Sequence, residues 1–128
     1  SQITNFGSSE YKVLFTPHLL PIKRGILSTI YLSINDNFNL ENVVNCLRDK
    51  YSEEKFIDYS DTIPSTHEVR GTNFCKMQAF FDENTNKVII ISVIDNLIKG
   101  ASGQAIQNLN LMLGFDESDG LINFSMFP

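Results

Sequence analysis

The residue types best suited to chemistry follow one another in a single run, residues 93–110. An apolar segment there ends in Asn96, and a loop of small residues then leads into an amphipathic pattern of helical period. Gly100 and Gly103 bracket the loop, so its backbone can approach a ligand, and a helix start offers main-chain N–H groups to an anion. These features would suit a ligand site, but the spacing alone is a weak signal, because it is not the GxGxxG pattern of a nucleotide-binding loop. The structural alternative is an Asx turn at Asn96 and simple loop closure, with Ser102 as the N-cap.

A second candidate site lies in residues 15–27, where two prolines and a glycine predict a rigid, irregular crossing segment. Arg24 carries a planar guanidinium, which holds a carboxylate or a phosphate through two parallel hydrogen bonds. His18 is a second side chain able to touch a substrate or a neighbouring subunit. The structural alternatives are a salt bridge from Arg24 to one of the fifteen acidic residues and a main-chain partner for His18.

The remaining candidates for chemistry have simpler interpretations. Cys46 falls inside a helical pattern and Cys75 opens a strand, and neither stands at a helix start, where thiols are activated. His67 lacks the spacing of a metal ligand, so we expect no metal and no catalytic residue here. Both cysteines are expected to be small core residues. Lys99 is expected to be a solvated lysine, and Asn73 to fix a turn.

The run VIDNLIKGASGQAIQNLN, residues 93–110, resembles the C-terminal signature of N-acetyl-gamma-glutamyl-phosphate reductases, which are NADP-dependent enzymes of arginine biosynthesis. The block FTPHLLPIKRGIL, residues 15–27, resembles the same family. The family's glycine-rich nucleotide loop, nucleophilic cysteine motif and histidine motif are absent from these 128 residues. The resemblance therefore implies a fragment, with a dimerisation and substrate domain at residues 11–128, while the polar residues 1–10 are expected to form a leader segment.

The resemblance also implies roles for single residues. Asn96 would reach the nicotinamide carboxamide, Gly100 and Gly103 would border NADP, and Arg24 and His18 would contact the substrate. The parent enzyme reduces N-acetyl-glutamyl 5-phosphate to N-acetyl-glutamate 5-semialdehyde with NADPH. Its cysteine and most cofactor contacts belong to a domain absent here, against which the final helix would pack, so the fragment alone is expected to be inactive.

Two alternatives to this interpretation stay open. One is a fragment of aspartate-semialdehyde dehydrogenase, which the proline-containing block matches poorly. The other is a stand-alone α+β module that does no chemistry and only associates with itself or binds a partner.

The composition is that of one packed domain, since 42% of the 128 residues are hydrophobic. A net charge of −5 disfavours nucleic acid and anionic membranes as partners. The longest apolar stretch, residues 88–94, is too short to span a bilayer, and no signal peptide is recognised. Two cysteines without metal spacing fit a reducing compartment. We expect a cytoplasmic protein whose partners are a small-molecule substrate and further copies of itself, in a dimer or tetramer.

The hydrophobic pattern predicts an α+β domain with a mixed, largely antiparallel sheet covered by helices. The expected strands are Tyr11–Phe15, Leu27–Ile34, Phe56–Tyr59, Lys76–Asp82 and Lys87–Ile94, the last two forming a hairpin. The expected helices run from the N-cap Asn39 to Tyr51 and from about Ser102 to Gly114.

The same pattern predicts which faces are buried. Strand 27–34 is expected to have one strongly buried face, carrying Ile30, Leu32 and Ile34, and the apolar segment 88–94 to be central and covered on both faces. The expected buried stripe of the first helix is Leu40, Val43, Val44, Leu47 and Tyr51. That of the second helix is Ala105, Ile106, Leu109, Met112 and Leu113.

Overall fold

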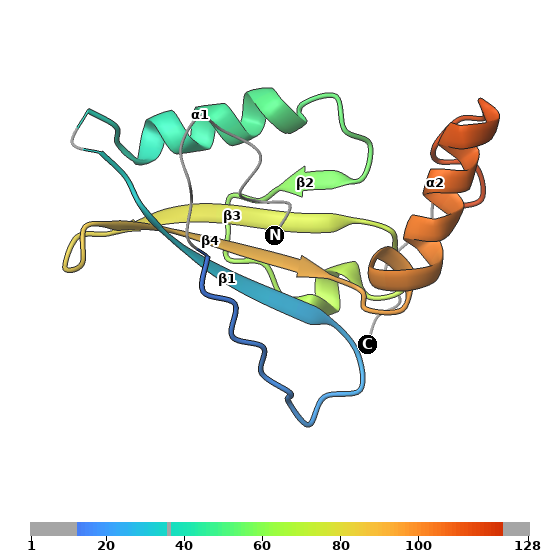
Figure 1. Ribbon diagram of the computed structural model, residues 1–128, viewed down its shortest axis with the longest axis horizontal. Coiled ribbons are helices and arrows are strands. Elements are labelled where there is room, and N and C mark those ends of the chain that lie inside the picture. The colour runs from blue at the N-terminus through green and yellow to red at the C-terminus, as the bar shows by residue number, and fades with distance from the viewer. Residues whose placement is uncertain (1–12, 36, 122–128) are drawn as a thin grey trace.

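The computed structural model describes residues 13–35 and 37–121 (Figure 1). The order of the elements is β1 (Ile26–Ser33), α1 (Leu40–Tyr51), β2 (Ile57–Tyr59), a short 3₁₀ helix (Thr66–Val69), β3 (Cys75–Asp82), β4 (Lys87–Ile94), a π-helical segment (Ile98–Ser102) and α2 (Gly103–Leu113). The predicted leader, residues 1–10, lies outside the described residues, as does the end of the tail from residue 122.

The four strands form one sheet in the order β1-β4-β3-β2. Strand β4 pairs antiparallel with both β1 and β3, and the short β2 runs parallel to β3. This confirms the predicted α+β class with its mixed, largely antiparallel sheet. In the register, Ile94 lies opposite both Ile26 and Cys75. The end of β4, the start of β1 and the start of β3 therefore lie side by side at the same end of the strands.

The hairpin and the first helix form as predicted. Helix α1 begins after Asn39, whose side chain accepts from the Asn42 N–H while the Asn42 side chain accepts from the Asn39 N–H. This reciprocal capping box satisfies two main-chain donors at the helix start. The predicted stripe is the half-buried side of the helix, and α1 contacts β3 (Figure 1).

The burial predicted for the sheet is only partly right. Strand β4 is central, as expected, but only Val88 and Val93 are fully buried along it. The strongly buried face expected for β1 is wrong, because Ile30 is 44% exposed and Leu32 and Ile34 are only half-buried. The physical reason is that β1 is the edge strand, and the described elements cover the sheet mainly at β3 and β4.

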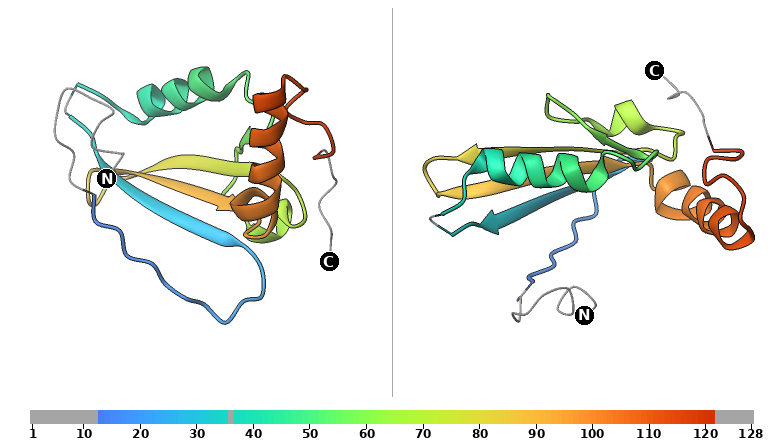
Figure 2. Two further views of the ribbon diagram at one scale, coloured as in Figure 1. Left: turned by 45° about the vertical axis from the view of Figure 1, so that its right-hand side comes forward. Right: turned by 90° about the horizontal axis from the view of Figure 1, so that it is seen from above.

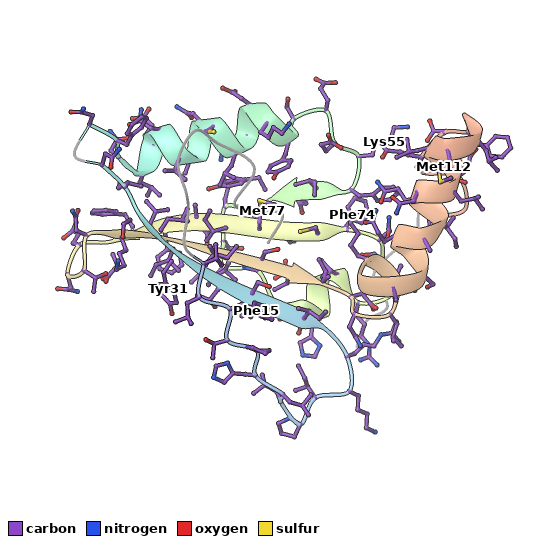
Figure 3. The ribbon with its side chains drawn as sticks, in the orientation of Figure 1. Phe15, Tyr31, Lys55, Phe74, Met77 and Met112 are labelled. Carbon is purple, nitrogen blue, oxygen red and sulfur yellow. The ribbon has the colours of Figure 1, made fainter. Side chains whose placement is uncertain are left out.

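The segment before β1 also departs from the prediction. Of the expected strand at residues 11–15, the described part forms no strand, and Phe15 is 82% exposed. The chain instead loops out beyond the β1 edge of the sheet before entering β1 (Figures 1 and 2). Tyr31 on β1 and Phe15 on this segment are labelled in Figure 3.

Helix α2 is turned opposite to its predicted orientation. Its expected buried stripe faces outward, with Met112 81% exposed (Figure 3), while its buried residues are Gly103, Gln107 and Asn110. The reason is that polar partners inside this chain hold the helix. The Asn110 side chain donates to the carbonyls of Glu117 and Asp119. Helix α2 ends at Gly114, as predicted.

The core of the described residues is small. Its buried apolar side chains are Phe56, Val69, Met77, Ala79, Val88, Val93 and Leu121. The burial of Leu121 shows that the chain after α2 packs against the domain up to this residue. In residues 13–35 and 37–121, no helix is long and apolar enough to cross a membrane.

The capping box makes a first prediction. Replacing Asn39 with Ala should lower the free energy of unfolding by about 1 kcal/mol, because an N-cap side chain is lost. Asn45→Ala, at an exposed position of the same helix, should instead stabilise by about 0.5 kcal/mol, since alanine has the higher helix propensity. Urea denaturation of both variants measures the difference. Equal effects of the two substitutions would show that the cap contributes nothing.

Candidate ligand site at the end of β4

The side chain at the centre of this region is Asp95, which follows β4 directly and is fully buried. Its carboxylate pairs with Arg24 through two atoms, Nε at 3.2 Å and Nη2 at 2.9 Å. It also accepts from the N–H groups of Gly71 at 2.7 Å, Leu97 at 2.8 Å and Ile98 at 2.9 Å. One carboxylate thus connects the segment before β1, the turn before β3 and the start of the last helical segment.

The hydrogen bonds also determine the protonation state of Asp95. Burial raises the pKa of its carboxyl group, but the Arg24 guanidinium and the three main-chain N–H donors lower it by more, so the net pKa lies below the ordinary value. Asp95 is therefore ionised at neutral pH, and Arg24 supplies the compensating charge that a buried carboxylate needs.

Asn96 holds the same crossing segment from the next position. Its side-chain oxygen accepts from the Gly25 N–H at 2.7 Å. Gly25 has a φ of 103°, and a Cβ there would come within 2.7 Å of the Thr66 Cβ, so only glycine fits. Among the described residues, the Asn96 amide nitrogen has no hydrogen-bond partner, which leaves this donor for a ligand. The cofactor role of Asn96 stays a prediction.

A cavity of about 280 Å³ opens beside the Arg24–Asp95 pair. Its walls come from the segment before β1 and from the 3₁₀ helix, and its lining residues are Ile22, Lys23, Arg24, Gly25, Thr66, His67, Arg70 and Asp95. The side chain of Arg24 is 28% exposed, whereas that of Asp95 is fully covered. Arg24 thus forms the exposed part of this ion pair at the cavity wall. The salt bridge of the structural alternative is formed, and the substrate contact of Arg24 stays a prediction.

The start of α2 differs from the expectation. Helix α2 begins directly after Ser102, as predicted, but Ser102 already has helical backbone angles and its hydroxyl donates to the Leu97 carbonyl at 2.8 Å, so its side chain does not cap the helix as the structural alternative supposed. The helix is entered through a π-helical segment, in which the Gly100 N–H donates to the Asp95 carbonyl at 2.9 Å. Asp95 itself occupies two further N–H groups, those of Leu97 and Ile98. The donors expected to be free at this end are therefore largely used within the chain.

The two glycines of the loop have different surroundings. Gly100 is exposed, and a Cβ there would make ordinary contacts of 3.4–3.6 Å with its neighbours. Gly103 is buried, and a Cβ there would lie 2.7 Å from the Ile98 Cγ2 and closer still to the Asn73 Oδ1. Packing within the chain accounts for glycine at 103, and only Gly100 faces outward. The cofactor contacts of Gly100 and Gly103 stay predictions.

Behind the glycines lies a polar network that the sequence analysis missed. The side chain of Gln107 accepts from Asn73 Nδ2 at 3.0 Å and from Lys99 Nζ at 2.8 Å, and donates to Glu117 at 2.9 Å. Burial lowers the pKa of Lys99, whose ammonium lies 5.5 Å from the centre of the Phe56 ring. The expectation of a solvated Lys99 is therefore wrong, because Lys99 joins α2 to the rest of the domain.

The other predicted residues lie apart from Asp95. His18 is exposed and its Nδ1 lies 3.1 Å from the Thr16 carbonyl, which is the main-chain partner of the structural alternative. Its substrate role stays a prediction. The cysteines are not core residues as expected, because Cys46 is exposed and Cys75 is half-buried beside Ser92. Within residues 13–35 and 37–121, no group of three or more His, Cys, Asp or Glu side chains could hold a metal.

Comparisons with known proteins fit this arrangement. Residues 1–96 match the family described as "Semialdehyde dehydrogenase, dimerisation domain". The chain belongs to this family, whose matched region covers three of the four segments that meet at Asp95 and Asn96. The α+β fold with its four-stranded mixed sheet agrees with such a domain.

The curated relatives carry a more specific name. A "Probable N-acetyl-gamma-glutamyl-phosphate reductase, chloroplastic" of Arabidopsis thaliana is 46% identical over 98% of this chain and 32% of its own length. An N-acetyl-gamma-glutamyl-phosphate reductase of Staphylococcus saprophyticus is 49% identical over 95% of this chain and 36% of its own length, and that of Staphylococcus aureus is 44% identical over the same shares. The chain thus spans about a third of the length of these relatives.

The buried pair gives a second prediction. Asp95→Asn should lower the free energy of unfolding at pH 7 by about 3 kcal/mol, because Arg24 and Gly71 lose a charged acceptor. The lowered pKa of Asp95 stabilises the fold above the unfolded pKa, about 3.9, and this contribution is lost as pH falls through the folded value. The difference in the free energy of unfolding between the parent chain and Asp95→Asn should therefore become smaller below about pH 4.

Asp61→Asn is the matched control for this change. Asp61 pairs with Arg48 at 3.0 Å, but its side chain is 90% exposed, so the substitution should change stability little at any pH. Urea unfolding between pH 3 and pH 7 measures how the free energy of unfolding of each variant, and of the parent chain, changes with pH. A gap for Asp95→Asn that does not vary with pH would contradict the assigned charge state.

The two glycines give a third prediction. Gly103→Ala should destabilise the chain by about 1–3 kcal/mol through overpacking, whereas Gly100→Ala should be neutral or slightly stabilising because its Cβ has space. Thermal unfolding of the two variants compares one substitution at two neighbouring positions. If Gly103→Ala were as stable as the parent chain, the close packing of Asn73 and Ile98 on Gly103 would be refuted.

Proposed function

We propose that this chain is the dimerisation and substrate domain of an NADP-dependent N-acetyl-gamma-glutamyl-phosphate reductase. The observation that carries the proposal is the 44–49% identity to reductases of this name over 95–98% of the chain. The parent reaction would be reduction of N-acetyl-glutamyl 5-phosphate to N-acetyl-glutamate 5-semialdehyde. The nucleophilic cysteine and the nucleotide domain would lie outside this sequence, so the chain alone would be inactive.

The residues around Asn96 fit one edge of a nicotinamide cofactor. The Asn96 NH₂ group is a donor suited to a carboxamide oxygen, and its own oxygen is held by the Gly25 N–H, which fixes the side chain. Gly100 presents an exposed stretch of backbone nearby, while Gly103 would support it by packing. When bound, NADPH supplies the hydride. The chain's part is then to orient the nicotinamide through Asn96.

Substrate would approach from the side of Arg24. The Asp95 carboxylate holds one edge of the guanidinium through Nε and Nη2, so the remaining N–H groups have a set direction for a carboxylate or phosphate. His18, on the exposed segment before β1, would meet the substrate or a neighbouring subunit. Asp95 acts here as a positioning residue.

The outward apolar face of α2 would contact the nucleotide-binding domain of the parent enzyme. Ile106, Leu109, Met112 and Leu113 are all exposed and share helical spacing. An exposed row of this kind is typical of a protein interface. Polar contacts hold the opposite side of the helix to this domain, so α2 would be shared between two domains.

The β1 edge would serve self-association, in a dimer or a tetramer. Leu27, Ile30 and Tyr31 are exposed along an edge strand, which favours burial against a second copy. The family's dimerisation name supports this assignment. We propose a cytoplasmic location, with free thiols at Cys46 and Cys75, and neither nucleic acid nor membrane as a partner.

A fourth prediction tests the cofactor contact in the full-length protein. Asn96→Asp keeps an oxygen for the Gly25 N–H but removes the NH₂ donor. It should raise KM for NADPH by about tenfold, corresponding to the 1–3 kcal/mol of an unsatisfied polar partner. Asn96→Ala loses both bonds and should also lower the melting temperature.

Absorbance of reduced nicotinamide at about 340 nm follows turnover. The isolated chain is the companion sample and should show none, whereas the full-length protein should reduce the acyl phosphate. Turnover by the isolated chain, or absence of reductase activity in the full-length protein, would refute the proposed function. An unchanged KM for NADPH in Asn96→Asp would remove only Asn96 from the site.

A further inference from the structure

The cavity beside Arg24 is positively charged in a protein that is acidic overall. Of the ten Lys and Arg residues in the sequence, Lys23, Arg24 and Arg70 all line this one cavity, together with His67. The net charge of the chain is −5. Cations gathered around a hollow in an acidic protein favour an anionic occupant, because their mutual repulsion is relieved when a negative charge enters.

Among the described residues, no carboxylate on the walls is free to neutralise Lys23, because the one there already pairs with Arg24. Asp95 is the one acidic residue among the lining side chains, and its two oxygens are already occupied by Arg24 and main-chain donors. Glu68 lies next to His67 in sequence, but it pairs with Lys76 and accepts from the Ser65 N–H, and it does not line the cavity.

The Arg24 guanidinium is held in a defined orientation at the wall of this cavity. It contacts Asp95 through Nε and Nη2. Because the guanidinium is planar, Nη1 points away from the carboxylate, and among the described residues it has no hydrogen-bond partner. The side chain is 28% exposed. Its free donors are thus fixed before any ligand arrives, which lowers the entropic cost of binding.

The size of the cavity fits a functional group rather than a single water. A water molecule occupies about 30 Å³ in the liquid, and the cavity measures about 280 Å³. The Thr66 side chain and the exposed Lys23 and His67 stand on the walls. Hydroxyl, ammonium and imidazole groups are all able to donate to oxygen atoms of an anion.

We propose that this cavity is an oxyanion subsite, in which Arg24, Lys23 and His67 bind a carboxylate or a phosphate group of the ligand. Its assignment to the substrate rests on the proposed function, since an acyl phosphate of an acidic amino acid carries both groups. Lys23 and His67 thereby become substrate-specificity residues in addition to Arg24.

The test uses the ¹⁵N-labelled chain, titrated separately with inorganic phosphate and with acetate at constant ionic strength, and chloride as the blank. The main-chain resonances of Lys23, Gly25 and His67 should shift with saturation. Lys23→Gln should weaken binding about fivefold or more, because one charge is lost at close range. Lys50→Gln, an exposed lysine at the end of α1, should leave the affinity unchanged.

Each outcome decides something. Saturable shifts with both anions support a general oxyanion subsite, and shifts with one of them alone assign it to that group. Absence of saturable shifts with either anion, or equal affinity in the parent chain and Lys23→Gln, overturns the proposal. Melting temperatures of the two lysine variants show that both are folded.

The full-length protein separates this proposal from the proposed function. Lys23→Gln should raise KM for the acyl phosphate while KM for NADPH stays constant. Phosphate binding by the chain without reductase activity of the full-length protein would refute the function and leave the subsite. Reductase activity with an unchanged substrate KM in Lys23→Gln would refute the subsite and leave the proposed function.

Discussion

The arrangement depends on one buried carboxylate. Asp95 is fully covered, and its hydrogen bonds reach the segment before β1, the turn before β3 and the start of the last helical segment. A buried charge is tolerated only when it is paired and fully hydrogen-bonded. The fold meets this demand by bringing Arg24 and three main-chain N–H groups to one point. Positions far apart in the chain are held together because the buried carboxylate is stable only when Arg24 and the three N–H groups all donate to it.

The candidate ligand site follows from that requirement. Once Asp95 fixes Arg24, the guanidinium has one side toward the protein and one toward the cavity. The neighbouring Asn96 holds Gly25 through its oxygen, which directs its NH₂ group elsewhere. Two side chains that look like ligand contacts, Arg24 and Asn96, therefore each use part of their polar group to hold the fold and keep another N–H donor free of partners among the described residues. The structural and functional interpretations of these residues are compatible.

The described domain also leaves large apolar surfaces uncovered. The outer face of α2 and much of β1 are exposed, while the buried apolar core holds few side chains. Apolar area of this extent is stabilised when a second surface covers it. The chain covers about a third of its relatives' length and belongs to a family described as a dimerisation domain. The outer face of α2 and the exposed part of β1 are two surfaces on which further protein could pack. The incomplete burial is thus consistent with a part of a larger assembly.

The sequence by itself determined the local structure. The hairpin, α1 with its Asn39 cap, and the α+β class follow from periodicity and turn residues, which act over a few positions. Tertiary structure alone decided the orientation of α2 and the partner of Arg24. An apolar stripe specifies that a face needs cover but not which body supplies it, so α2 turned its polar side inward. The role of Asp95 depended on charges and N–H groups more than 20 residues away. The sequence signal for this role was local, an Asp at the end of a strand just before main-chain N–H groups that it can accept from. Only the tertiary structure buries Asp95 and thereby places it at the centre of the site.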